Sequence, residues 1–139
     1  MLIRPCRAPD ADGLVALWVA CDLVRPWNDP HADIERKLAD SPELLLVGEV
    51  DGLVVGSVMA GYDGHRGWIN YLAVHPSAQR RGLGRELMVA AEERLAALGC
   101  AKINLQVRDG NDAGQGFYEA IGYTRQPLVD YGKRLISDE

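Results

Sequence analysis

Residues 68–98, WINYLAVHPSAQRRGLGRELMVAAEERLAAL, carry the pattern around which the rest of the chain is organised. An apolar segment at 69–74 is followed by a polar loop with two closely spaced glycines, and then by leucines at helical intervals. Gly82 and Gly84 have no Cβ, so the backbone can pass close to a ligand there. The stretch therefore predicts a strand, a glycine-containing loop and a helix whose first N–H groups are unpaired.

The loop is expected to bind an anion. Unpaired N–H groups and the positive end of the helix dipole favour phosphate at a helix N-terminus. Arg80, Arg81 and Arg85 add positive charge, and the planar guanidinium group suits phosphate oxygens. We refer to residues 79–85 as the cradle and predict that it holds a phosphate group.

Two common phosphate-binding motifs do not match this loop. A P-loop needs Lys-Ser or Lys-Thr after its second glycine, and no such pair occurs in the chain. A dinucleotide fingerprint needs a third glycine where Leu87 stands, and a tighter turn than residues 75–81 allow. A nucleotide-binding regulator is therefore disfavoured.

Length and composition predict a single domain over residues 1–139. The chain is 47% hydrophobic and 25% charged, as is usual for globular proteins. A net charge of −5 argues against a nucleic-acid-binding protein, which normally carries a basic face. The three cysteines form neither a metal motif nor a complete disulfide set, and the three histidines have no ligand spacing, so we expect no metal. No leader segment and no apolar run of about 18 residues is visible, so we expect a cytoplasmic protein without a membrane span.

Hydrophobic periodicity and turn residues predict an α/β chain. A hairpin with an Asp51-Gly52 turn is expected near the middle, and the strand–helix–strand order around the cradle predicts a parallel crossover. We expect strands at 2–6, 44–50, 53–60, 68–74, 102–107, 123–128 and 131–136, and helices at about 10–22, 28–40, 83–98 and 111–121.

The cradle resembles a family signature. Residues 79–84, QRRGLG, match the Q/R-x-x-G-x-G/A motif of the GCN5-related N-acetyltransferases (GNAT), and the resemblance continues through 71–76, Asn111 and 117–123. It spans nearly the whole chain, and residues 25–30, 61–67 and 132–136 are similar to small bacterial members. The resemblance implies the GNAT fold, a mixed and mostly antiparallel sheet of six to seven strands with about four helices. A splayed parallel pair of strands would form the cofactor site.

The resemblance also implies acetyl-CoA as cofactor. Its pyrophosphate would lie on the amides of the cradle, and its pantetheine arm along the central strand, where free N–H and C=O groups could pair with it. The cofactor-binding residues implied in this way are Leu72, Ala73, Val74, Gln79, Arg80, Arg81, Gly82, Leu83, Gly84, Arg85, Asn111 and Tyr118.

Two residues are implied to act in catalysis. The Leu72 N–H would donate to the oxyanion that forms during attack on the thioester, which lowers the barrier by several kcal/mol. Tyr118 would give a proton to the leaving thiolate. Each position also has an ordinary structural role, because Tyr118 can fill the core beside Phe117 and Asn111 can simply cap a helix.

The sequence assigns no general base. Some relatives carry a glutamate where this chain has Gln106, whose amide cannot take up a proton as a carboxylate does. Asp63, His65, Tyr71 and Asp109 are the candidates that could act instead, through water. None of these four residues occupies position 106, where the relatives carry the glutamate.

Acceptor recognition is expected in the loops. Arg25 and Trp27 lie in a loop between two helices, and Asp63, His65 and Tyr71 lie before and within the central strand. Trp27 could equally pack over the sheet edge, and Asp63 and His65 are also ordinary turn residues.

Two functions remain open. The first is an acetyl-CoA-dependent N-acyltransferase, in which a primary amine of a small molecule or a peptide N-terminus attacks directly. The second is a non-catalytic acyl-CoA-binding or sensing module. A homodimer is compatible with either.

Overall fold

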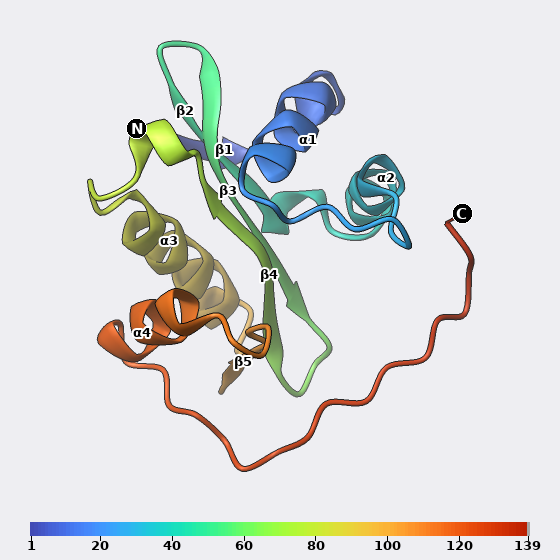
Figure 1. The fold of residues 1–139 in the computed structure, drawn as a ribbon, viewed down its shortest axis with the longest axis vertical. Helices are drawn as coiled ribbons and strands as arrows, with labels where there is room; N and C mark the ends of the chain where they lie inside the picture. Colours follow the sequence, from blue (N-terminus) through green and yellow to red (C-terminus); the bar gives the residue numbers. More distant parts are fainter. Residues whose placement is uncertain (139) are drawn as a thin grey trace.

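A computed structural model describes residues 1–138, which form one five-stranded sheet with helices on both faces (Figure 1). The strands are β1 (Leu2–Pro5), β2 (Leu45–Val50), β3 (Leu53–Tyr62), β4 (Gly67–Val74) and β5 (Ile103–Leu105). The helices are α1 (Ala11–Ala20), α2 (Pro30–Asp40), α3 (Leu83–Ala97) and α4 (Asp112–Ala120), and short 3₁₀ turns lie at Ala8–Asp10, Pro42–Leu44 and Pro76–Ala78.

The strands are ordered β1-β2-β3-β4-β5 in the sheet. The first four are antiparallel to their neighbours, while β4 and β5 are parallel and are connected through α3. The β2–β3 turn places Asp51 and Gly52 at φ 51° and 79°, the left-handed pair that a two-residue type I′ turn requires. The hairpin and the parallel crossover predicted from the sequence are confirmed.

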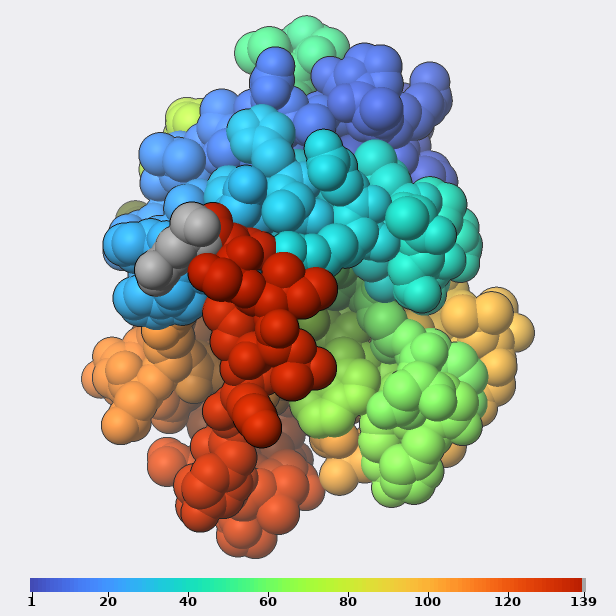
Figure 2. Space-filling view, turned by 90° about the vertical axis from the view of Figure 1, so that its right-hand side faces the viewer, coloured from blue at the N-terminus to red at the C-terminus, as the bar shows by residue number. Residues whose placement is uncertain are grey.

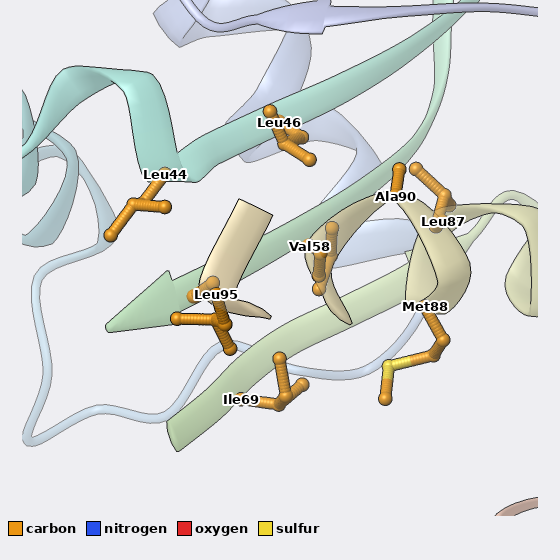
Figure 3. Close-up of a cluster of buried hydrophobic side chains, with 10 residues drawn as sticks. Leu44, Leu46, Val58, Ile69, Leu87, Met88, Ala90 and Leu95 are labelled. Atoms are coloured by element: carbon orange, nitrogen blue, oxygen red, sulfur yellow. The ribbon is translucent and has the colours of Figure 1, made fainter. Parts of the chain in front are cut away.

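The two faces of the sheet bury two separate cores. Alternate residues of β2 point to opposite faces, so Leu46 joins the core under α3 while Leu45 and Val47 join the core under α1 and α2. Figure 3 shows the first of these cores, in which Leu46 and Leu87 are fully buried. Figure 1 shows α3 and α4 on one side of the sheet and α1 and α2 on the other.

The helix ends follow local rules. The Asp29 carboxylate caps α2 by accepting hydrogen bonds from the N–H groups of His31 at 2.9 Å and Ala32 at 3.3 Å. Pro30 occupies the first turn, where its missing N–H costs nothing. The C-terminal end of helix α3 is followed by Gly99. This glycine adopts φ 88°, the left-handed conformation that ends a helix.

The two closing strands predicted at 123–128 and 131–136 are wrong. Residues 122–138, which we call the C-terminal tail, contain no strand, so the described sheet has five strands and not six to seven. Among the described residues, 124–136 make no backbone–backbone hydrogen bond. Pro127 has no N–H to donate to a ladder, and the tail is attached to the body through side chains instead.

Candidate active site

The centre of β4 contains a β-bulge. The β3–β4 register moves from Ser57 opposite Ala73 to Met59 opposite Asn70, so β4 has one residue more than β3 over this stretch. The extra residue changes which way the side chains point. Ile69 packs in the core under α3, whereas Tyr71, two residues later, packs in the core under α1. A regular strand would place both on the same face.

Tyr71 is held in an unusual conformation at this bulge. Its φ of 51° is rare for a residue with a bulky side chain. The Ser57 hydroxyl donates to the Tyr71 carbonyl at 2.7 Å, and the Trp18 indole N–H donates to the Ser57 oxygen at 2.9 Å. The Trp18 and Tyr71 rings stack with centroids 3.7 Å apart. These contacts fix the backbone that leads into Leu72.

Beyond the bulge, β4 separates from its parallel neighbour. The β4–β5 pairs run from Gly67 with Ile103 to Ile69 with Leu105, while β4 itself continues to Val74. In the described chain, residues 70–74 of β4 therefore have backbone groups without a β5 partner. These residues include Leu72, Ala73 and Val74, at which pantetheine binding was predicted.

The cradle lies between β4 and α3. Arg80 and Gly82 have φ values of 65° and 76°, and Gly82 is the N-cap residue of α3. A Cβ added at Gly82 would meet no atom within 4 Å, so the space in front of this backbone is open. The Gln79 amide donates to the Val74 carbonyl at 3.0 Å, which ties the cradle to the end of β4.

The arginines of the cradle have free guanidinium groups. Within the described residues 1–138, the side chains of Arg80, Arg81 and Arg85 are exposed and make no hydrogen bond or ion pair. Gly84 faces α4, and a Cβ there would lie 3.3 Å from the Phe117 ring. The geometry fits a phosphate group, because open backbone amides and unpaired cations meet at the start of a helix of 15 residues.

Helix α4 supplies Asn111 and Tyr118. The Asn111 side chain caps the helix by accepting from the Gly114 N–H at 3.0 Å, so its structural role is present. Tyr118 packs edge-on against Phe117 and Tyr123, and burial raises the pKa of its phenol to about 12. Both Asn111 and Tyr118 also line a pocket.

This pocket has a volume of about 1040 Å³ and lies between α2, β4 and the start of α4. Figure 2 shows the face of the molecule that carries the tail, drawn in red. The tail runs up this face to α2 and the loop before it. The lining includes Arg25, Trp27, Tyr71, Leu72, Asp109, Asn111 and Tyr118. The cradle itself is not part of this lining; β4 connects the two, with Leu72 in the pocket and Val74 bound to Gln79.

Asp63 and His65 lie elsewhere, in the β3–β4 turn. The Asp63 carboxylate accepts from the N–H groups of His65 at 2.8 Å and Arg66 at 2.7 Å, and these bonds lower its pKa. It therefore acts as a turn residue in this structure, and neither side chain is among those that line the pocket. Their assignment to acceptor binding has no geometric support.

The remaining base candidates differ in suitability. Burial, together with a hydrogen bond to Asp33, raises the pKa of Tyr71, so its phenol holds its proton firmly. The Gln106 amide donates to Asp130 at 2.5 Å, which connects β5 to the tail. Asp109 lines the pocket.

Sequence reasoning did not identify Asp33, which also lines the pocket. It lies on the polar side of an amphipathic helix, where the pattern predicts contact with solvent. The tyrosine partner, Tyr71, lies 38 residues away in sequence, so no local signal connects the two. The same is true of Ser57 and Trp18, whose hydrogen bond joins residues 39 apart.

Within the described residues, no three His, Cys, Asp or Glu side chains are grouped as a metal site. No helix in that part of the chain is long and apolar enough to cross a membrane.

The chain is similar to known proteins over its whole length. It is 52% identical over 139 residues to an acetyltransferase, YE1169, of Yersinia enterocolitica, covering all of this chain and 99% of that protein. It is 52% identical over 138 residues to an acetyltransferase, ECA0875, of Pectobacterium atrosepticum, covering 99% and 98% of the two chains.

Solved structures show the same fold at low identity. An aminoglycoside N-acetyltransferase, AAC(6')-Iy, in complex with CoA gives a TM-score of 0.75 at 20% identity, over 96% of this chain and 99% of that one. The NatC complex bound to Gag peptide and CoA gives 0.75 at 21% identity, over 90% and 85%. The family model described as the acetyltransferase (GNAT) family matches residues 13–123. The chain therefore belongs to the GNAT family of acetyltransferases.

Proposed function

We propose that the chain transfers the acetyl group of acetyl-CoA to a primary amine by direct attack. The observation that carries the proposal is the stretch 70–74 of β4, which has no β5 partner in the described chain and leads from the cradle to the pocket that contains Leu72 and Tyr118. AAC(6')-Iy and the NatC complex, which share this fold, were both solved with CoA. Membership of the GNAT family supports the same cofactor.

Each part of the site has a defined task in this proposal. The amides and arginines of the cradle hold the pyrophosphate. Backbone groups of Leu72, Ala73 and Val74 on the side without a β5 partner pair with the pantetheine amides, apart from the Val74 carbonyl, which already accepts from Gln79. Acetyl-CoA supplies the activated acetyl group. The Leu72 N–H donates to the attacked carbonyl as negative charge builds on its oxygen.

Tyr118 supplies the proton that the leaving sulfur takes up. Its phenol is buried and its pKa is raised to about 12, so it is fully protonated at neutral pH. A general acid must hold its proton until the transition state, but a free thiol has an ordinary pKa near ~8.5, so burial also makes the phenol give its proton to the thiolate less readily than an unburied tyrosine would. The proton therefore moves to sulfur only when sulfur becomes negative.

The acceptor is a primary amine of a small molecule or a peptide N-terminus. The two CoA-bound neighbours named above are an aminoglycoside N-acetyltransferase and a complex bound to a peptide. These structures are related to this chain at about one-fifth identity, so they support the class of reaction and not one acceptor.

The proposal is tested by following free thiol release from acetyl-CoA with a panel of amines and peptides. We expect release to depend on the acceptor and to saturate with its concentration. Slow release that does not change with any acceptor would favour the non-catalytic acyl-CoA-binding module.

A further inference from the structure

The Asp33 carboxylate lies in the pocket between α2, β4 and the start of α4, where we propose that the acceptor binds. It lies in the first turn of α2, and its side chain is 21% exposed. Its Oδ2 accepts from the Tyr71 hydroxyl at 2.6 Å and from the Asn28 amide at 2.5 Å. Its Oδ1 has one contact, with the Arg36 guanidinium at 3.3 Å. A carboxylate has about four lone-pair positions, so Oδ1 retains capacity for another donor.

The charge of Arg36 is taken up mainly by another residue. Its two terminal guanidinium nitrogens, Nη1 and Nη2, both donate to Asp138 in the tail. Asp138 also accepts from the Asp29 N–H at 3.1 Å, and the Arg36 bond lowers the pKa of Asp138 to about 2. The contact of Arg36 with Asp33 is therefore the weaker one, and the negative charge of Asp33 is only partly balanced.

Tyr71 connects this carboxylate to the reaction centre. Its hydroxyl is bound to Asp33, its ring stacks on Trp18, and its backbone forms the bulge immediately before Leu72. A group bound at Asp33 is therefore one tyrosine side chain away from the amide assigned to the thioester carbonyl. The conformation of this link is fixed at both ends, because Ser57 holds the Tyr71 carbonyl.

The other carboxylates of the pocket are less suitable for binding a cation. The Asp22 side chain is 97% exposed and lies 3.6 Å from Arg25, and the exposed Asp40 accepts from the neighbouring Ser41 hydroxyl. Water screens such exposed charges strongly. Asp109 is also exposed, so of these four carboxylates Asp33 is the one that combines partial burial with a half-buried aromatic partner, Tyr71.

The total charge of the lining limits the class of acceptor. Four carboxylates and four cationic side chains surround the pocket, the cations being Arg25, Arg36, Lys37 and Arg108. Because the two signs balance, the lining as a whole does not attract cations, and binding of a single ammonium group depends on Asp33 itself.

We infer that Asp33 receives the ammonium group of a singly charged alkyl amine in the pocket that Leu72 also lines. This inference rests on the proposed function, and it assigns the acceptor end of the same site. The bound ammonium releases one proton to water before its nitrogen attacks the acetyl carbon. The C–S bond then breaks, the sulfur takes up a proton from Tyr118, and the nitrogen gives its second proton to water.

The test is a calorimetric titration of the CoA-loaded protein with phenethylammonium and with 2-phenylethanol, which has a hydroxyl in place of the ammonium. We expect the unmodified protein to bind the ammonium at least about tenfold more tightly than the alcohol. Asp33→Asn should remove this preference and leave the alcohol unchanged, because Asn can still accept from Tyr71. Asp33→Glu, which keeps the charge, should keep most of the preference.

Glu35→Gln is the matched control, because Glu35 lies on the same helix, is exposed and does not line the pocket. It should change neither affinity. The inference is overturned if the unmodified protein shows no preference for the ammonium, or if Asp33→Asn weakens both ligands equally. Failure of the protein to bind CoA in the loading step would count against the proposed function instead, and the titration of the free protein would still test Asp33.

Discussion

Tyr118 has a structural role in the core and, in the proposed function, a chemical one. Its ring contacts Phe117 and Tyr123 in the core, and its hydroxyl-bearing side chain also lines the pocket. The burial that stabilises the fold raises the pKa of the phenol to about 12. The two roles predicted from the sequence are therefore compatible, because the apolar surroundings keep the acid protonated.

We predict that Tyr118→Phe lowers turnover by about 10²-fold, since a positioned proton donor contributes about this much or more. The affinity for acetyl-CoA should stay nearly constant, because Phe keeps the ring contacts. Steady-state kinetics and calorimetry of the two proteins measure both effects. In the unmodified enzyme, the Tyr118 phenol should stay protonated up to about pH 12. Its ionisation should therefore not lower turnover below that pH. A fully active Tyr118→Phe protein would remove the acid role.

Ser57 is fully buried and accepts from Trp18 while it donates to Tyr71. Ser57→Ala leaves the Trp18 indole N–H without this acceptor, and we expect the free energy of unfolding to fall by about 1–3 kcal/mol. Urea denaturation measures this change. Ser77→Ala, at an exposed serine, should stay within about 0.5 kcal/mol of the unmodified protein. Equal stability of both variants would show that the bond to Trp18 contributes nothing.

The residues of the site differ in how far the sequence could predict them. The cradle stands in a contiguous stretch whose glycines, arginines and helix start predict it directly, and the family resemblance implies the role of Tyr118. Asp33 lies on an ordinary polar helix face and is brought to Tyr71 only by the packing of α2 against the sheet. The bulge that orients Tyr71 depends on long-range contacts and has no local pattern.

At the scale of elements, local turn chemistry decided which predictions succeeded. The predicted Asp-Gly turn depends on two adjacent residues and is present, and the observed Asp29 cap and Gly99 helix end are equally local. Strand β5 extends over Ile103–Leu105 and not over 102–107, because β4 and β5 separate after three pairs. The closing strands failed because an alternating pattern alone does not provide a partner for the ladder.

The cradle can be tested as one element through Gly82. We predict that Gly82→Trp weakens acetyl-CoA binding by at least about tenfold, because the indole fills the open space before the α3 amides. Calorimetry measures the dissociation constant. Gly64→Trp is the matched control, since Gly64 also has a positive φ of 90° and open surroundings but lies in the β3–β4 turn. If the two substitutions had the same effect on affinity, the cradle assignment would fail.

At the scale of the whole molecule, the two cores and the tail contribute very differently to stability. The sheet is covered on both faces, and its buried residues form two contiguous clusters. The tail exposes Leu128, Tyr131 and Leu135 almost fully. Residues 124–136 of the tail contact the body through side-chain bonds such as Arg134 with Asn28, and exposed polar contacts of this kind are worth little.

We therefore predict that the amides of residues 124–136 exchange with solvent far faster than those of β3. Amides without a backbone partner need no unfolding event to exchange, whereas β3 opens only with the sheet. Hydrogen–deuterium exchange followed by mass spectrometry measures both segments in one experiment. Slow exchange in 124–136 would indicate that this segment pairs as the strands expected from its sequence.

The most direct test of the central claim identifies the products of one reaction. The protein is incubated with acetyl-CoA and phenethylamine, and mass spectrometry quantifies acetylated amine, free CoA and acetate. The proposed reaction predicts acetylated amine and free CoA in equal amounts, with almost no acetate. Free CoA matched by acetate, with no acetylated amine for any amine in the panel, would contradict it.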